Sequence, residues 1–224
     1  MAIAENIKTI QSGIPSHVTL VAISKTKPLE AIMEAYNSGI RIFGENKVQE
    51  LTSKYEQLPK DIEWHLVGHL QTNKVKYIAP FVSLIHSVDS LSLLKEIDKQ
   101  AKKNNRIIRC LLQVYIASEE TKFGLSEEEL NELVHSEELA SLSNVSICGL
   151  MGMATFTDNT SQIRKEFNSL SLIFQRLKET LFANHQEFKE ISMGMSSDYR
   201  IAIEEGSTMV RIGSDIFGER NYKL

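Results

Sequence analysis

A lysine at the end of an apolar run is the first candidate for chemistry in this sequence. The run VTLVAISK, residues 18–25, is rich in β-branched residues, which is typical of a strand buried on both faces of a parallel sheet, and it ends at Ser24 and Lys25. An amine in that place could bond to a carbonyl compound as a Schiff base. A lysine that closes a strand also commonly extends into water, and from this stretch alone that second interpretation is favoured.

Small polar residues and an arginine near the C-terminus form the second candidate. They are Ser196, Ser197, Arg211, Gly213 and Ser214. Hydroxyl groups can donate hydrogen bonds to an anion, a glycine lets a backbone amide approach it closely, and an arginine adds a fixed positive charge. The alternative is structural: a serine caps a helix, Gly213 turns the chain, and Arg211 pairs with a carboxylate such as Glu45.

Eight strand-like runs alternate with helical patterns along the whole chain. The runs are residues 18–25, 41–46, 63–68, 82–88, 106–116, 145–153, 190–195 and 209–213. The clearest helical face consists of Ile163, Phe167, Leu170, Phe174, Leu177 and Leu181, and Thr157 or Asp158 is the expected cap of that helix. A capping box from Ser126 to Glu129 begins another helix.

The alternation predicts an α/β protein with a single closed (β/α)₈ barrel, the TIM-barrel architecture. Parallel strands need crossover helices, and closure removes the exposed edges of the sheet. An open doubly wound sheet is the second choice. Because no repeat, low-complexity tract or linker interrupts the pattern, we expect one domain over residues 1–224. In such a barrel the loops after strands seven and eight commonly bind phosphate, and they hold the second candidate group here.

Composition narrows the class of protein further. The 224 residues are 42% hydrophobic and carry a net charge of −4, and the pI near 5.9 argues against a nucleic-acid binder. No apolar run approaches the length of a membrane span, and the first residues do not read as a signal peptide. Cys110 and Cys148 lie in apolar runs, as expected for buried free thiols. We therefore expect a cytoplasmic protein, and the composition is compatible with a monomer.

Barrel closure would bring the two candidate groups to one mouth. An amine on strand one, a phosphate site after strands seven and eight, and an arginine on strand eight suit a phosphorylated aldehyde. Pyridoxal 5'-phosphate (PLP) needs these parts: a lysine for the Schiff base, a site for the phosphate, and a residue facing the pyridine nitrogen. The alternative is a Schiff-base aldolase that acts on sugar phosphates, which would also need acid–base partners nearby.

Several long motifs resemble the pyridoxal-phosphate homeostasis proteins, and together they run nearly from end to end. They are AISKTKP (22–28), FGENKVQE (43–50), WHLVGHLQTNK (64–74), HSVDS (86–90), GLMGMA (149–154), SMGMSSDY (192–199) and VRIGSDIFGER (210–220). The resemblance implies a fold similar to the barrel domain of alanine racemase, that is, a fold type III PLP protein.

The same resemblance assigns candidate cofactor residues. Lys25 is implied to form the Schiff base with PLP, and Asn46 to lie near that bond. The residues implied around the phosphate and the ring are Ser196, Ser197, Arg211, Gly213 and Ser214. It leaves two questions open: how Ser196 and Ser197 divide their roles, and whether Arg211 meets the phosphate or the pyridine nitrogen.

The resemblance also implies a function. Alanine racemase carries a second, β-rich domain that adds a catalytic tyrosine, and we expect none in this chain because it ends soon after strand eight. A more open cofactor site suits a non-catalytic protein of vitamin B6 and amino-acid homeostasis that stores PLP or delivers it to PLP-dependent apoenzymes. A racemase-like, PLP-dependent enzyme acting on amino acids is the alternative. The spacing of His65 and His69 could suit a metal on a helix, but they stand at a strand end, so no metal site is expected.

Overall fold

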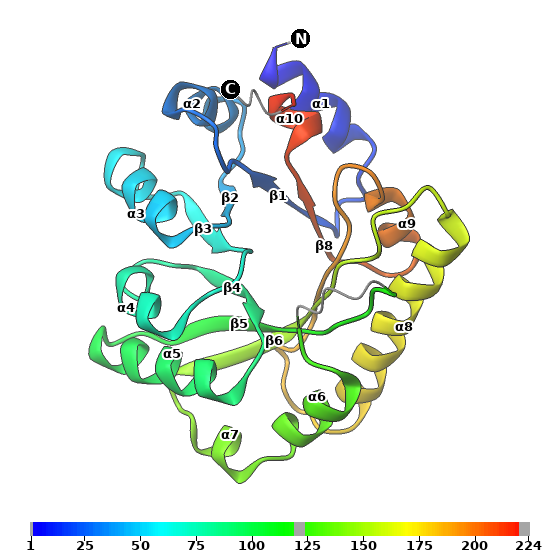
Figure 1. Cartoon of the computed structure of the whole chain (residues 1–224). Helices are drawn as coiled ribbons and strands as arrows, with labels where there is room; N and C mark the ends of the chain where they lie inside the picture. The colour runs from blue at the N-terminus through cyan, green and yellow to red at the C-terminus, as the bar shows by residue number, and fades with distance from the viewer. Residues whose placement is uncertain (1, 119–123, 220–224) are drawn as a thin grey trace.

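Eight parallel strands form a closed barrel in the computed structural model, which describes residues 2–118 and 124–219. Each strand pairs with the next along the chain, and β8 pairs with β1 (Figure 1). The strands are β1 Thr19–Ile23, β2 Ile42–Glu45, β3 Glu63–Leu66, β4 Leu84–Val88, β5 Ile108–Gln113, β6 Val145–Met151, β7 Glu190–Ser192 and β8 Met209–Ile212. The predicted (β/α)₈ barrel is therefore confirmed, and the open sheet is excluded.

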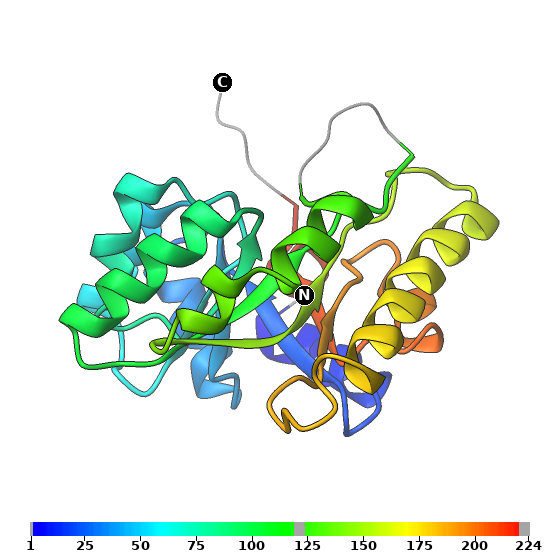
Figure 2. The same ribbon diagram turned by 90° about the horizontal axis from the view of Figure 1, so that it is seen from below.

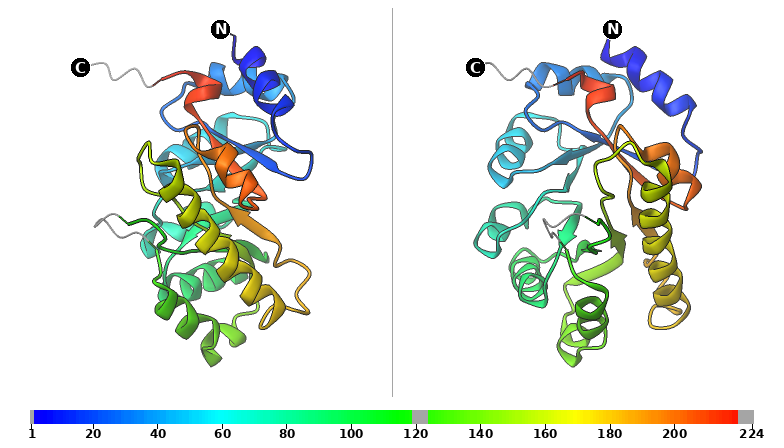
Figure 3. Two further views of the ribbon diagram at one scale, coloured as in Figure 1. Left: turned by 90° about the vertical axis from the view of Figure 1, so that its right-hand side faces the viewer. Right: turned by 45° about the vertical axis from the view of Figure 1, so that its right-hand side comes forward.

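Helices surround the strands and connect them (Figure 2). They are α1 Ile3–Ser12, α2 Leu29–Asn37, α3 Val48–Gln57, the 3₁₀ turn η1 Thr72–Lys74 with α4 Val75–Ile78, α5 Leu91–Lys103, α6 Glu127–Val134, α7 Glu137–Ser141, α8 Thr160–Glu179, α9 Tyr199–Glu204 and α10 Ser214–Phe217. The first and last helices lie side by side (Figure 3), and the Asn6 amide donates to the Ile216 carbonyl at 3.0 Å. In the described part of the chain, no helix is long and apolar enough to cross a membrane.

Closure of the barrel sets the register between the first and last strands. Val21 lies opposite Arg211, and Ala22 lies opposite Ile212. Because the strands are parallel, the loop after β1 and the loop after β8 leave the barrel at the same end. The register thus brings the Lys25 segment next to the end of β8.

Two apolar clusters stabilise the barrel. The larger cluster fills the space between the strands and the helices, and it includes Trp64 and Phe167, which are 1% and 0% exposed. The smaller cluster lines the barrel interior with residues from several strands. Its members are Val21, Ile23, Leu84, Leu111, Cys148, Met151 and Met209.

Cys110 and Cys148 are both buried free thiols, as predicted, and burial raises the pKa of the Cys110 thiol.

Several predicted boundaries were wrong in detail. Strand β1 ends at Ile23, so Lys25 stands in the following loop, and β5 is shorter than the predicted 106–116 run. The cap of α8 is Asn159, whose side chain accepts from the Gln162 amide at 3.2 Å; Thr157 accepts from the Asn159 amide instead, so neither Thr157 nor Asp158 is the cap. Leu181 lies beyond the end of α8 and is 37% exposed.

The capping box of α6 forms as predicted, with Ser126 accepting from the Glu129 amide and the Glu129 carboxylate accepting from the Ser126 amide. Helix α7 was missed, because its short acidic sequence has no apolar face to mark it. Arg220, the last residue of the VRIGSDIFGER motif, lies outside the described residues.

Candidate functional site

The C-terminal mouth of the barrel contains a cavity of about 390 Å³. Its lining includes all seven side chains or backbone positions singled out from the sequence, together with apolar neighbours. The lining residues are Ile23, Lys25, Lys27, Asn46, Val67, Met153, Phe156, Met195, Ser196, Ser197, Arg211, Gly213, Ser214 and Gly218. A groove of about 620 Å³ between α2 and α3 contains none of the predicted site residues. The tertiary structure thus brings together residues that are up to 189 positions apart in sequence.

Lys25 reaches the cavity from the loop after β1. Val21 and Ile23 belong to the interior cluster, and because side chains alternate along a strand, Lys25 continues on the same inner side just past the strand end. The loop turns sharply here: the Lys27 amide donates to the Ser24 carbonyl at 3.0 Å, and Thr26 has a φ of 65°. A positive φ costs a β-branched residue of the order of 1 to 3 kcal/mol, so the surrounding contacts must hold this conformation.

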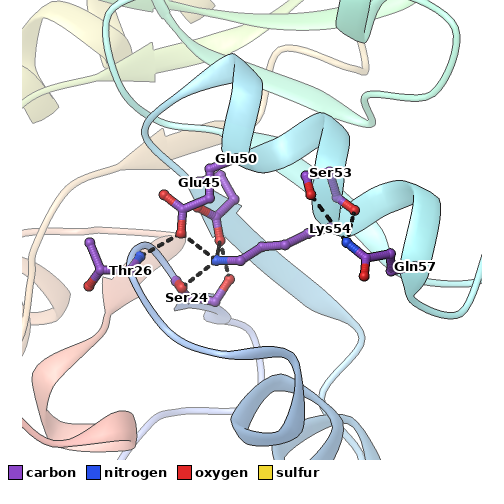
Figure 4. Close-up of polar contacts among 7 residues, drawn as sticks. All are labelled: Ser24, Thr26, Glu45, Glu50, Ser53, Lys54 and Gln57. Atoms are coloured by element: carbon purple, nitrogen blue, oxygen red, sulfur yellow. Dashed lines mark hydrogen bonds and ion pairs between the residues drawn. The ribbon is translucent and has the colours of Figure 1, made fainter.

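The contacts that hold the loop lie on the outer side of the barrel and flank Lys25 on both sides (Figure 4). Before it, the Ser24 hydroxyl donates to Glu45 Oε1 at 2.6 Å, and the Ser24 carbonyl accepts from Lys54 Nζ at 2.7 Å. After it, the Thr26 amide donates to Glu50 Oε1 at 2.6 Å. These four residues, Ser24, Glu45, Glu50 and Lys54, are called the loop clamp below.

The ammonium group of Lys54 is the centre of the loop clamp. Its Nζ lies 2.7 Å from Glu45 Oε1 and 2.6 Å from Glu50 Oε1, and the Lys54 and Glu45 side chains are 6% and 0% exposed. Burial raises the pKa of the Glu45 carboxyl, although the charge of Lys54 and hydrogen bonds from Lys54 and Ser24 act in the opposite direction. Glu45 therefore pairs with Lys54 and not with Arg211, which was the structural alternative for that arginine.

Arg211 is a buried cation whose described contacts are all to neutral groups. From β8, its Nη1 donates to the carbonyl and to the hydroxyl of Ser192 at 2.7 Å each, and its Nη2 donates to the Gly152 carbonyl at 3.0 Å. The residue is 4% exposed. Burial lowers the pKa of Arg211 to about 10, while Asp198 acts in the opposite direction, so the guanidinium stays charged at neutral pH. A charged donor buried in this way favours a ligand that brings a hydrogen-bond acceptor into the cavity.

The loops after β7 and β8 meet at the part of the cavity next to the end of β1. The Gly213 amide donates to Ser196 Oγ at 3.4 Å, which ties the two loops together. A Cβ atom at Gly213 would lie 3.2 Å from the Ile23 carbonyl oxygen, so glycine allows β8 to turn into α10 close to β1. Ser197 and Ser214 are exposed at this rim. Hydroxyl and amide donors therefore surround one edge of the cavity.

Asn46 is partly buried and enters the cavity because of a glycine on the neighbouring strand end. A Cβ atom at Gly68 would lie 2.4 Å from the Asn46 carbonyl oxygen and 2.8 Å from its Cα. Any side chain at position 68 would therefore displace the segment that presents Asn46 to the cavity.

Residues that the sequence did not single out also contribute to the mouth. The Lys27 ammonium donates to the carbonyls of Phe217, Gly218 and Glu219 at 3.1, 2.8 and 3.1 Å, which joins the β1 loop to the end of α10. Met153 and Met195 supply an apolar wall. Their positions follow from loop geometry, and no spacing pattern in the sequence marks them.

The two histidines considered as a metal pair take different places. His65 is 2% exposed on β3, whereas the His69 side chain is 56% exposed and lies 3.4 Å from Asp89. Burial lowers the pKa of His65 to about 3. Within residues 2–118 and 124–219, no group of three or more His, Cys, Asp or Glu residues is placed to hold a metal ion.

Comparison with known proteins finds relatives along nearly the whole chain. The family described as "Alanine racemase, N-terminal domain" matches residues 1–221. A pyridoxal phosphate homeostasis protein from Aquifex aeolicus is 45% identical over 205 residues, covering 91% of this chain and 87% of that protein. The protein of the same name from Vibrio alginolyticus is 40% identical over 237 residues and covers 99% of both chains.

Solved structures extend the comparison to the fold. PipY from Synechococcus elongatus, solved without PLP, superposes with a TM-score of 0.89 at 36% identity, over 96% of this chain and 100% of that one. The same protein with PLP bound superposes with a TM-score of 0.86. Alanine racemase from Bartonella henselae shares the fold at a TM-score of 0.72 and 16% identity, over 98% of this chain and 60% of the racemase.

Proposed function

Because this chain belongs to the pyridoxal phosphate homeostasis protein family, which shares the alanine racemase N-terminal domain, we propose that it binds PLP as a Schiff base on Lys25. The observation that carries the proposal is the cavity itself: a lysine amine, a buried arginine without a carboxylate contact among the described residues, and a rim of hydroxyl and amide donors face one space of about 390 Å³. PipY, which is 36% identical, has been solved with PLP bound.

The donor set fits the chemical groups of PLP. The phosphate needs several hydrogen-bond donors, and Ser196, Ser197, Gly213 and Ser214 supply hydroxyl and amide groups at the rim. The aldehyde needs an amine, which Lys25 supplies from the neighbouring loop after β1. When bound, PLP supplies an electrophilic carbon and an electron-withdrawing ring.

Arg211 is proposed to face the pyridine nitrogen, while the rim holds the phosphate. Its guanidinium is drawn toward Ser192 and Gly152 on the β6 and β7 side of the barrel, and both Nη1 bonds go to Ser192. A guanidinium gives up a proton far less readily than a pyridinium does, so it leaves the ring nitrogen without a proton and weakens the ring as an electron sink. Asn46 follows β2, which pairs with β1, and it lines the same cavity as Lys25.

The proposed role is to hold PLP for storage or delivery rather than to turn over a substrate. Two arguments support it: the proposed position of Arg211 next to the ring, and the observed charge of the cavity lining. The ionisable side chains that line its described part are Lys25, Lys27 and Arg211, all cations, which suits retention of an anion. The family name assigns its members to PLP homeostasis, and PLP-dependent apoenzymes are the proposed recipients. We propose that the protein acts as a cytoplasmic monomer.

Native mass spectrometry, with and without borohydride reduction, tests the proposal. The wild-type protein incubated with PLP should bind one equivalent that becomes permanently attached after reduction, and the attached mass should map to the peptide with Lys25. Lys25→Ala should lose the attached mass, whereas Lys102→Ala, at an exposed position on α5, should keep it. Undiminished attachment in Lys25→Ala would refute the Schiff-base assignment, and a dimer in the same spectrum would refute the monomer.

The racemase-like alternative makes a separate prediction. A racemase exchanges the α-hydrogen of its amino acid with solvent, so a panel of amino acids in deuterium oxide should then show Lys25-dependent exchange. A holding protein should show none above the level that free PLP produces. Exchange that requires Lys25 and exceeds this level would overturn the non-catalytic role and leave the PLP site intact.

A further inference from the structure

We propose that His86 is a positioning residue that, through Ser192, fixes the orientation in which Arg211 faces the ring of bound PLP. The inference rests on the proposed function, because it takes Arg211 to be the ring-facing residue. It starts from a row of four polar side chains inside the barrel, His65, His86, Ser192 and Arg211, called the interior chain below. The mechanism of PLP binding described above uses only the last of them.

The interior chain is continuous and almost fully buried. Arg211 Nη1 lies 2.7 Å from Ser192 Oγ, Ser192 Oγ lies 2.9 Å from His86 Nδ1, and His86 Nε2 lies 3.0 Å from His65 Nδ1. Arg211 lies on β8, Ser192 on β7, His86 on β4 and His65 on β3. Arg211 is 4% exposed and His65 2% exposed, while the other two residues are 0% exposed. The interior chain thus runs across the barrel from the cavity to the opposite wall.

Strand alternation explains why these polar groups share the interior. Leu84 and Met209 belong to the interior apolar cluster, and His86 and Arg211 follow two positions later on the same strands. Two residues further along a strand is one layer nearer to the mouth. A polar layer therefore lies directly above the apolar layer and below the cavity.

The hydrogen bonds of the interior chain point in one direction. Arg211 can only donate, so Ser192 Oγ accepts from it. The Ser192 hydroxyl hydrogen is then available for His86 Nδ1, which leaves the His86 proton on Nε2 to be donated to His65 Nδ1. The opposite direction would have Ser192 accept from both neighbours and would leave its hydroxyl hydrogen outside the chain. His86 is accordingly assigned as the neutral tautomer with its proton on Nε2.

The charges around His86 favour its neutral form. Arg211 and Arg109 are the charged groups that act on it, and both are cations. Burial, then His65 and these arginines, lower the pKa of His86 well below its usual range. A neutral acceptor fixes Ser192 without removing the charge of Arg211, whereas a carboxylate in the same place would form an ion pair and draw the guanidinium away from the cavity.

Fixing Ser192 fixes Arg211, because both Nη1 bonds go to that one residue. If Ser192 Oγ turned to another rotamer, the guanidinium would keep one Nη1 bond and could rotate. Its remaining hydrogens would then meet the ring nitrogen at a different angle. The electronic state of bound PLP, and hence its absorption spectrum, should report this change even where the protein stays folded.

Three substitutions at one position separate positioning from simple packing. His86→Asn places an amide oxygen near the Nδ1 position and keeps an acceptor for Ser192. His86→Gln places its amide nearer to the Nε2 position and lacks that acceptor, and His86→Leu has no acceptor at all. Gln100→Leu is the control for loss of stability alone, because it removes a buried polar side chain that lies on α5, outside the interior chain.

PLP is the probe, and each variant is titrated with it while its spectrum is recorded. His86→Leu and His86→Gln should change the ratio of the visible to the near-ultraviolet band, and His86→Leu should raise the dissociation constant about twofold to tenfold. His86→Asn should restore the wild-type ratio, and Gln100→Leu should leave it unchanged. If a His86 variant fails to fold, Ser192→Ala breaks the same chain at its next link and should shift the band ratio in the same direction.

A measurement without PLP tests the hydrogen-bond direction itself. Nitrogen-15 chemical shifts of the imidazoles should show a neutral His86 with its proton on Nε2. A proton on Nδ1, or a spectrum of His86→Leu and Ser192→Ala identical to that of the wild type, would overturn the inference while PLP binding stands. A wild-type protein that takes up no PLP would refute the proposed function and this inference together.

Discussion

The loop clamp offers a sharp test of the structural reasoning, through the substitution Lys54→Met. Methionine keeps most of the length of the lysine side chain and removes its ammonium group. That group makes three short contacts, to the Ser24 carbonyl, Glu45 and Glu50, at 2.7, 2.7 and 2.6 Å. The substitution would leave Glu45, whose side chain is 0% exposed, without its counter-charge.

The expected loss follows from that burial. Removing one partner of a buried ion pair costs about 3 to 5 kcal/mol of unfolding free energy. For a chain of this size each kcal/mol lowers the melting temperature by about 2 to 4 °C, so we expect a decrease of roughly 6 to 20 °C. Glu45 Oε2 already has no hydrogen-bond partner among the described residues, so the protein has little spare capacity to solvate this carboxylate.

The loss of unfolding free energy in Lys54→Met should also depend on pH. In the variant the folded-state pKa of Glu45 should rise further than in the wild type, because the opposing charge of Lys54 is gone. A carboxyl group with a raised folded pKa stabilises the protein while it is protonated and loses that contribution as the pH rises through the window between its unfolded and folded values. The difference between variant and wild type should therefore grow with rising pH.

Urea denaturation at several pH values measures both effects. The control is Lys99→Met, since Lys99 makes an exposed ion pair with Glu96 at 3.2 Å and should lose no more than about 1 kcal/mol. The double variant Lys54→Met/Glu45→Gln should recover much of the loss, because it removes the unpaired charge. A loss in Lys54→Met no larger than in the control would refute the idea that the clamp holds a buried charge.

The remaining predictions concern the cofactor site and the interior histidines. Arg211→Met removes the charged donor proposed for the ring nitrogen, and Ser196→Ala removes a donor to the phosphate. Each should weaken PLP retention about tenfold to a hundredfold in equilibrium dialysis, because hydrogen bonds that involve a charged group contribute about 1.5 to 3 kcal/mol; unchanged retention in both would place PLP elsewhere. Gly213→Ala should lower both stability and PLP affinity, since its Cβ would lie 3.2 Å from the Ile23 carbonyl oxygen of β1. The control Gly13→Ala should lower neither, because its Cβ would lie 3.6 Å from the nearest neighbouring atom. Equal behaviour of the two variants would contradict the close approach of Gly213 to β1. His65→Gln should reduce the loss of unfolding free energy that acid causes. In the wild type the folded pKa of His65 is about 3, so the unfolding free energy should fall by up to about 1.4 kcal/mol per pH unit as the pH drops below about 6.5. The same dependence of unfolding free energy on pH in both proteins would disprove the burial of His65 as a neutral group.

Much of the fold followed from local patterns. The apolar runs marked all eight strands because parallel strands buried on both faces need nearly continuous β-branched and apolar residues. The alternation with helices then left few ways to connect them. Boundaries were less accurate: Lys25 lies past its strand, and α8 is capped by Asn159 rather than by its neighbours. Several adjacent residues could cap a helix, and only the local backbone decides among them.

The residues of the candidate site could be predicted where short motifs contain residue types suited to its chemistry. Lys25 at a strand end and the serine, arginine and glycine positions near the C-terminus could be named from residue type and expected element ends. The residues that hold these site residues in place could not be named from the sequence. Lys54 appears in the sequence as an ordinary helical lysine, and its burial depends on Glu45 of one strand and the loop after another.

The sequence by itself therefore determined the order of strands and helices and the residue types available for a Schiff base and an anion site, because these follow from periodicity and side-chain chemistry. Tertiary structure alone decided which of those residues meet. Closure of β1 against β8 put Lys25 beside Arg211, and the barrel interior aligned His65, His86 and Ser192 behind that arginine. The pairing of Val21 with Arg211 alone joins residues 190 positions apart in sequence, and only the register of the closed sheet fixes such distances.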